Sequence, residues 1–436
     1  MIKWCVWSAV TASALRAGRA FFPLDDELAL LPGALTPSLQ EDLVRLGVWM
    51  PFGRAAQELA HFRHTVVSRP TAERLTEAAG AAYVAVQTAE VGRLEREAPE
   101  PPAGPAKLFL SVDGAMVPLV GGAWAEVKTL VLGEVQPPEP ENGELVVHTR
   151  QHSYFSRLAD AETFQRLALV ETQRRGVETA GAVAAVTDGS EWIQKFVDQH
   201  SYRAVRILDF PHAGEHIHAV GQAHWGEGSA QAQAWLAEQL HTLKHRGPAP
   251  VLSAVRRLVD EQPEHGERAT HLAYLEKREA HMQYPAFQAA GWPIGDGAVE
   301  SANKLVVEAR LKGSGMHWTR EHVDPMLALR NIVCNDRWDE AWPQITTRLR
   351  QQAQQRRMAR HQQRRLAAPG QPGPAPQPSP LPPPLAASTT NNLPSSASPP
   401  KSSSGPWRPP ADHPWRHMPI GRARFKPSSK QANAKT

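Results

Sequence analysis

The chain has very little cysteine and no long apolar segment. Cys5 and Cys334 are the only cysteines among its 436 residues, which excludes the disulfide framework of small secreted proteins. No run of residues approaches the ~20 apolar positions that a membrane span needs. The N-terminal apolar stretch before Gly18 matches a short signal peptide only in part. We therefore expect a protein of the reducing cytoplasm that has no membrane partner.

Aromatic residues are absent from residues 371–405, where Lys401 is the only charged residue. Such a segment buries too little apolar surface to offset the loss of chain entropy, so its composition predicts a disordered linker. The linker lies within residues 366–436, which we expect to form a disordered, basic tail rich in Pro and Ser.

Positive charge is concentrated in the same C-terminal part of the chain. Residues 351–436 contain 13 Lys or Arg and one Asp, a charge of +12, so the total of +4 leaves residues 1–350 with 4 − 12 = −8. Residues 406–427 mix Arg and Lys with Trp and Phe. This composition suits backbone contacts and base stacking on DNA, and the alternative is a solvated, unstructured terminus.

The first hundred residues have apolar residues at helical spacing. The pattern predicts three helices in series, over residues 36–50, 51–63 and 69–87. We interpret residues 21–98 as a helical DNA-binding region of the helix-turn-helix type, with a structural bundle as the alternative. Ser68 can cap the third helix, which leaves Arg69 and Arg74 near the end that would enter a major groove. Four prolines between residues 99 and 105 then mark a boundary.

From residue 107 the pattern changes to strands. Three strands, a helix, a strand, a helix and a strand are predicted, in that order, over residues 107–113, 123–135, 143–151, 154–175, 181–188, 191–200 and 203–209. This order predicts an α/β fold with a ribonuclease-H-like catalytic core, which we place at residues 107–345.

Three carboxylates stand at the ends of these predicted elements. Asp113 and Asp188 each close a strand, and Glu300 opens a helix that Asp296 or Gly297 can cap. Active groups gather at strand ends in open α/β sheets, and carboxylate oxygens are the ligands that a hard cation such as Mg²⁺ prefers. The alternative readings are an Asp-Gly turn at each aspartate and a surface Glu-Lys pair at Glu300.

Basic residues follow the third carboxylate. Arg310 and Lys312 lie beside two glycines in a loop suited to phosphate contact, and Lys304 shares the helix face of Glu300. Together with Arg69 and Arg74, these three residues are our candidate DNA contacts.

A competing motif lies between the second and third carboxylates. His212, Glu215 and His216 match the H-x-x-E-H pattern of inverted zinc proteases, in which two His and one Glu share a helix face. A third ligand would have to come from a residue such as Glu276 or Glu279. This reading leaves the other acidic motifs unexplained.

Taken together, the motifs SVDGAMVPL, WAEVK, TDGSEWI, ILDFPHAGEH and DGAVESANKLVVEARLKGSGMHW resemble insertion-sequence transposases of the Kra type, which are relatives of the Mutator-like DDE enzymes. FFPLDDELAL and HPWRHMPIGRARF extend the similarity to nearly the whole chain, apart from the first 20 residues and the proline-rich linker.

The resemblance implies specific roles for individual residues. Asp113, Asp188 and Glu300 would form a metal-binding and catalytic triad for Mg²⁺ or Mn²⁺. Asp209 and His212 match a D-x-x-H motif that supports the active site, and a mostly helical insertion is expected at about residues 213–290. Family members usually carry a cysteine-rich zinc module before FFPLD, but residues 1–20 offer only Cys5, so we expect an atypical, truncated start.

The activity that the resemblance implies is DNA transposition. Such an enzyme cleaves transposon ends and joins them to target DNA, so double-stranded DNA is the expected partner. We also expect a homo-oligomer on DNA and a location at the nucleoid in the cytoplasm. The alternatives are an inactive DNA-binding remnant, a ribonuclease-H-like nuclease that does not transpose, and the zinc protease.

Overall fold

The structure is a computed structural model that describes residues 12–14, 19–21, 30–31, 33–141, 143–261 and 266–366. Two short strands, β1 (Ala12–Ala14) and β2 (Arg19–Phe21), pair with each other. The predictions of a truncated start at residues 1–20 and of a disordered basic tail fall almost entirely outside the described residues.

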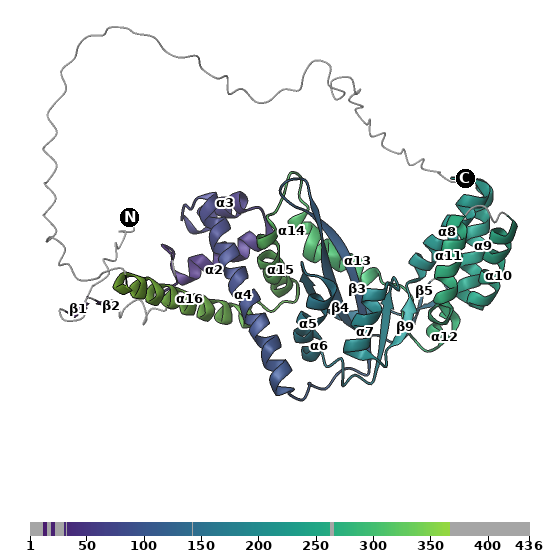
Figure 1. Cartoon of the computed structure of the whole chain (residues 1–436), viewed down its shortest axis with the longest axis horizontal. Helices are drawn as coiled ribbons and strands as arrows, with labels where there is room; N and C mark the ends of the chain where they lie inside the picture. Colours follow the sequence, from purple (N-terminus) through teal and green to yellow (C-terminus); the bar gives the residue numbers. More distant parts are fainter. Residues whose placement is uncertain are drawn as a thin grey trace, which may run out of the picture. The chain divides into compact units, whose positions relative to one another are not determined.

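The centre of the fold is a mixed five-stranded sheet with helices on both faces, so the chain has an α/β fold (Figure 1). The strand order is β7-β4-β3-β8-β9. β3 pairs antiparallel with β4 and β4 with β7, whereas β3 pairs in parallel with β8 and β8 with β9. The strand bounds are β3 (Lys107–Pro118), β4 (Trp124–Val135), β7 (Thr149–Arg157), β8 (Ala182–Thr187) and β9 (Val205–Leu208).

Alternate side chains of β3 pack into different hydrophobic cores, because successive side chains of a strand point to opposite faces of the sheet. Leu108, Leu110 and Val112 pack with side chains of α5 (Ala161–Leu167) and α7 (Glu191–Ser201) on one face. On the other face Phe109 packs into a core with the helices that follow β9. The sheet is therefore buried on both sides.

Three predicted elements have wrong boundaries. The strand that begins at Lys107 does not end at Asp113 but continues to Pro118, because residues 114–118 pair with β4. The third strand was expected over residues 143–151 and the next helix over residues 154–175. Instead, β6 (Glu144–Val146) pairs with β5 (Glu139–Glu141), β7 continues to Arg157, and the helical part is limited to α5 and α6 (Leu169–Arg174).

The three N-terminal helices form as predicted, although the third is longer. They are α2 (Pro37–Trp49), α3 (Phe52–Arg63) and α4 (Arg69–Glu97). The Ser68 hydroxyl caps α4 by accepting a hydrogen bond from the Thr71 N–H at 3.3 Å. These helices also contact two later ones, α15 (Arg320–Cys334) and α16 (Trp338–Leu366), and share buried side chains with them.

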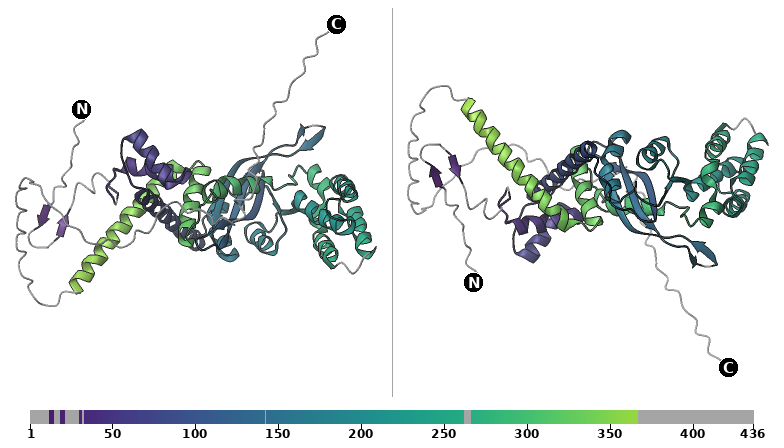
Figure 2. Two further views of the ribbon diagram at one scale, coloured as in Figure 1. Left: turned by 90° about the horizontal axis from the view of Figure 1, so that it is seen from above. Right: turned by 90° about the horizontal axis from the view of Figure 1, so that it is seen from below.

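The span between β9 and Glu300 is mostly helical, as expected for the insertion. It contains α8 (Phe210–Trp225), α9 (Ala230–Arg246), α10 (Pro248–Glu261), α11 (Gly266–Lys277), the short 3₁₀ helix η1 (Glu279–Met282) and α12 (Tyr284–Ala289). Figure 2 shows α8 to α12 as one group, apart from α2 to α4 in both views. In the part of the chain that the structure describes, no helix combines the length and the apolar character that crossing a bilayer requires.

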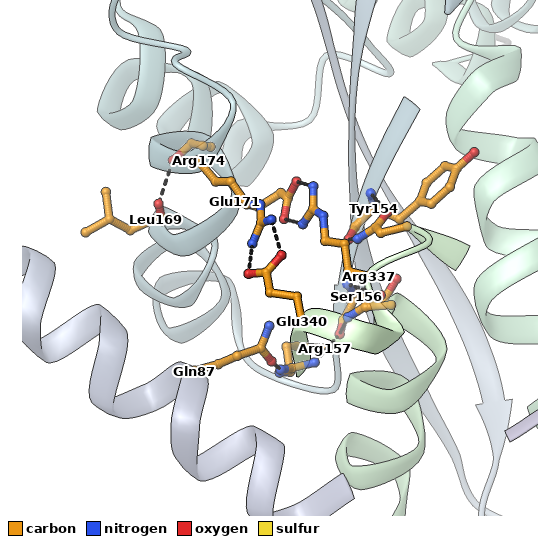
Figure 3. Close-up of polar contacts among 12 residues, drawn as sticks. Gln87, Tyr154, Ser156, Arg157, Leu169, Glu171, Arg174, Arg337 and Glu340 are labelled. Atoms are coloured by element: carbon orange, nitrogen blue, oxygen red, sulfur yellow. Dashed lines mark hydrogen bonds and ion pairs between the residues drawn. The ribbon is translucent and has the colours of Figure 1, made fainter. Parts of the chain in front are cut away.

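A cluster of ion pairs joins α6 to the C-terminal helix (Figure 3). Arg337 donates two hydrogen bonds, of 2.6 and 2.8 Å, to the Glu171 carboxylate. The Glu171 side chain is only 4% exposed and that of Arg337 is 18% exposed. Arg174 and Glu340 form a second, more exposed pair nearby. Bidentate pairing in a partly desolvated place is the strong form of this interaction.

Helix α15 covers the outer edge of β7 with side-chain amides. The Asn335 amide accepts from the Tyr154 N–H at 2.8 Å and donates to the Tyr154 carbonyl at 2.9 Å. Asn331 makes the same two bonds with Ser156, at 3.1 and 3.2 Å. Four helical residues rise about 6 Å and two strand residues span about 6.6 to 6.8 Å, so amides four residues apart match alternate residues of the strand.

We expect Gly80→Ala to destabilise the protein, because α4 and α15 touch at this glycine. A Cβ at Gly80 would lie 2.1 Å from the Pro325 carbonyl oxygen, which is backbone and cannot turn aside. Overpacking of this kind costs about 1–3 kcal/mol. Gly92→Ala in the same helix is the matched control: its Cβ would approach only the flexible end of Arg96, at 3.3 Å. It should gain about 0.5–1 kcal/mol. Urea unfolding measures both, and equal effects would contradict the close crossing.

Candidate active site

Asp113 lies in β3, and Asp188 directly follows β8, the strand that pairs with β3 in parallel. Each paired residue of β8 stands 75 positions after its partner in β3, from Lys107 with Ala182 to Leu110 with Ala185. Asp188 also stands 75 positions after Asp113. Residues level with each other in parallel strands point to the same face of the sheet, so the register directs both aspartates to the face of the core that contains Phe109 and Ala184.

Asp188 begins a tight turn between β8 and α7. Its Oδ1 accepts a hydrogen bond of 2.8 Å from the Ser190 N–H. Gly189 has φ of +76° and faces Arg278, whose Nε would lie 2.4 Å from a Cβ at this position. The Tyr274 hydroxyl donates to the Asp188 carbonyl oxygen. The aspartate is therefore held both by its own turn and by residues of the helical segment after β9.

Glu300 reaches the same face from a different direction. It lies in the short helix α13 (Gly297–Ala302), which contacts both β3 and β4. A π-helical turn, η2 (Asn303–Glu308), and α14 (Ala309–Leu311) continue this helix. The Asn303 amide donates a 2.8 Å hydrogen bond to Oδ2 of Asp113. Single π-turns inside helices occur frequently at functional sites, and this one fixes the orientation of an acidic side chain.

The carboxylates are close enough to affect one another. Burial raises the pKa of the Asp113 carboxyl, and the negative charges of Asp188, Glu300 and Glu126 raise it further, against a hydrogen bond from the Gly114 N–H. A raised pKa means that the ionised form is disfavoured in the folded protein. A bound cation would relieve this repulsion.

Asp209 braces the site from the end of β9. Its Oδ2 accepts from the His212 N–H and its Oδ1 from the Asp296 N–H, both at 2.8 Å, so it connects the start of α8 to the start of α13. Burial, followed by the charges of Asp209, Asp113 and Glu300, raises the pKa of Asp296 to about 8. A side-chain hydrogen bond with Asp209 also raises the pKa of Asp296.

The donor set fits a hard divalent cation in its chemistry. Asp113, Asp188 and Glu300 supply only oxygen atoms, which Mg²⁺ and Mn²⁺ favour, and they repel one another in a partly buried place. Among the described residues, however, no three His, Cys, Asp or Glu side chains are grouped closely enough to hold a metal ion. Two of the carboxylates direct an oxygen to the Asn303 amide and the Ser190 N–H instead.

Sequence reasoning missed several residues of this site. Glu126 lies across Gly114, where an added Cβ would be 2.3 Å from its Oε1, so this glycine makes room for a side chain within the strand and does not form a turn. Asn303, Tyr274 and Arg278 also contact the aspartates or the residues beside them. The motif WAEVK contains Glu126, but nothing in its spacing shows the contact with Gly114.

The candidate DNA contacts have different environments. Arg69, Arg74 and Lys304 are exposed, and Lys312 is paired with Glu308 at 2.6 Å. Arg310 is only 2% exposed, and the prediction that it contacts a phosphate is wrong. Its Nε donates to the Gly47 carbonyl at 3.0 Å, and its guanidinium lies over the rings of Phe52 and Trp318.

The H-x-x-E-H residues lie on α8 but are engaged elsewhere. Nδ1 of His216 is 2.9 Å from Nδ1 of His271, and the His216 ring is stacked on Tyr274. Glu215 is mostly exposed and lies 3.3 Å from the His212 ring nitrogen. Burial and nearby cationic groups lower the pKa of His216 to about 4, so its ring is neutral. No group of three potential ligands that could hold a metal ion is found among the described residues.

No family model matches this chain, and no curated protein is similar enough to it to count as a match.

Proposed function

We propose that this protein is a metal-dependent DNA transposase of the DDE type, which cleaves the ends of an insertion sequence and transfers them to target DNA. The observation that carries the proposal is the parallel register of β3 and β8. Continued past its last pair, Leu110 with Ala185, this register directs Asp113 and Asp188 to the sheet face on which α13 packs. The charges of Asp188 and Glu300, from segments far apart in the sequence, both act on the Asp113 carboxyl, which supports the proposal.

The topology supports a ribonuclease-H-like core for this proposal. Within the five-stranded sheet, the antiparallel strands β3, β4 and β7 come first along the chain, and helical connections then lead to the parallel strands β8 and β9. This is the order of elements expected for that core. The helical segment α8–α12 enters after β9, before Glu300.

In this proposal Asp113, Asp188 and Glu300 hold Mg²⁺ or Mn²⁺. The bound ions would activate water and then a 3′-hydroxyl, and would stabilise the attacking and leaving oxygens of the phosphodiester. The chain's own residues prepare the site. Asn303 orients the Asp113 carboxylate, and Asp209 ties α8 to the segment before Glu300. The substrate is double-stranded DNA, bound by a homo-oligomer at the nucleoid.

The test uses the full chain and a labelled duplex that contains the DNA flanking its coding sequence. With Mg²⁺ or Mn²⁺ we expect cleavage at discrete positions that exposes 3′-hydroxyls, and none in EDTA. Uniform degradation of unrelated duplexes would indicate a nuclease that does not transpose. Binding without cleavage in either metal would indicate an inactive remnant, and the absence of both would reject the proposal.

A further inference from the structure

A small basic pocket lies beside the Asp188 turn and plays no part in the proposed catalytic chemistry. Its volume is about 280 Å³, and we call it the α7 pocket. Gly189 lines this pocket and directly follows Asp188 in the sequence, so a ligand in the pocket is next to the second aspartate. Its lining includes Gly189, Glu191, Gln194, Lys195, Lys277 and Arg278.

Cations outnumber anions in the lining. Lys195, Lys277 and Arg278 are positive, and Glu191 is the only carboxylate that lines the pocket. Lys277 and Glu191 form an ion pair at 3.1 Å, but both side chains are largely exposed, and such pairs contribute little. The pKa of His281, which also lines the pocket, is lowered by burial and then by Arg206 and Arg278. The pocket is therefore electropositive at neutral pH.

Arg278 is the fixed part of the pocket. It is 8% exposed, and its guanidinium lies over the Tyr274 ring at 3.5 Å. Nε and Nη2 donate to the Gly189 carbonyl and Nη1 donates to the Tyr274 carbonyl. These bonds use three of the five N–H groups of a guanidinium, so they leave two N–H groups unused.

Helix α7 begins beside this pocket, which Glu191 of its first turn lines. Ser190 occupies the N-cap position, but no side chain caps the helix, and the buried Ser190 hydroxyl has no hydrogen-bond partner. Helix N-termini favour anions because their first N–H groups are unpaired and the helix dipole is positive there. The two lysines, Arg278 and the helix end all favour the same kind of ligand.

We propose that the α7 pocket binds a phosphate group, namely a backbone phosphate of the DNA strand whose neighbouring phosphodiester lies at Asp188. The identity of the strand rests on the proposed function, whereas the phosphate chemistry rests on the pocket alone. Because the DNA strand is held both in the pocket and at Asp188, its direction relative to Asp113 and Asp188 is fixed. The pocket therefore positions the DNA and takes no part in the chemical step.

The test compares Lys195→Gln/Lys277→Gln with a control of equal charge, Arg246→Gln/Arg257→Gln, whose residues are exposed on α9 and α10. Duplex binding is measured by fluorescence anisotropy over a range of salt concentrations. The pocket variant should bind more weakly, and its plot of log K against log salt should be flatter by about 1 to 2, the change expected when one or two phosphate contacts are lost. The control should keep the slope of the unmodified chain.

Titration calorimetry with inorganic pyrophosphate tests whether the pocket binds free phosphate groups as well as the phosphates of DNA. If the unmodified chain binds no duplex but binds pyrophosphate in a way that the pocket variant loses, the proposed function fails and the phosphate site stands. If duplex binds and all three proteins have the same salt slope, the pocket proposal is overturned. If neither ligand binds, both proposals fail.

Discussion

Asp113→Asn should abolish metal-dependent cleavage, with a loss in rate of roughly 10³-fold or more, while the fold is retained. Removal of one charge-stabilising group from a preorganised site typically has an effect of this order. The fold should survive because burial and neighbouring carboxylates raise the pKa of Asp113. Above that pKa the ionised carboxylate lowers the free energy of unfolding. A neutral amide of the same shape avoids this loss.

The measurement combines cleavage rates with thermal unfolding at pH 7 to 8. We expect an unchanged or slightly higher Tm for the variant. Asp260→Asn, the same change at an exposed position of α10, is the control and should alter neither quantity. Cleavage by Asp113→Asn within tenfold of the unmodified rate would show that this aspartate is not part of the reacting site.

Glu171→Ala should cost about 3–5 kcal/mol of unfolding free energy, the largest stability effect that we expect. The change leaves the Arg337 guanidinium in a mostly buried place without its carboxylate, and an unpaired buried charge carries a cost of this size. Two short hydrogen bonds are lost at the same time.

Glu340→Ala is the matched control, since its partner Arg174 lies in the same cluster but the two side chains are 48% and 42% exposed. Exposed pairs contribute about 0–1 kcal/mol. Urea unfolding followed by circular dichroism should separate the two variants clearly. Equal losses of unfolding free energy in the two variants, or a loss below about 1 kcal/mol for Glu171→Ala, would contradict the burial of the pair that Glu171 forms with Arg337.

The sequence predicts most strands of the sheet, because the signal lies in the residues of each strand itself. Runs such as KLFLSV and AVAAV are apolar throughout because their strands are buried on both faces, and that pattern is visible without a structure. The end of β3 was missed because Asp113 and Gly114 form the commonest turn dipeptide. Only the pairing of residues 114–118 with β4 shows that the strand continues.

The candidate site could be predicted only in part, because a sequence pattern reports local structure and not tertiary contacts. Asp113, Asp188 and Glu300 stand out through their positions in the elements, whereas the contacts around them are tertiary. Arg310 was misjudged because the Gly47 carbonyl that it binds is 263 residues away in the sequence. The raised pKa of Asp296 likewise depends on burial and on Asp209, neither of which its own segment contains.

The amides of Asn331 and Asn335 have a consequence for how copies of this chain can assemble. An open strand edge invites a strand from another molecule, but at β7 the outward groups of Tyr154 and Ser156 already bond to these two side chains. A second copy therefore cannot extend the sheet at β7 unless α15 first moves away. Any complex of several copies on DNA has to use surfaces other than this edge.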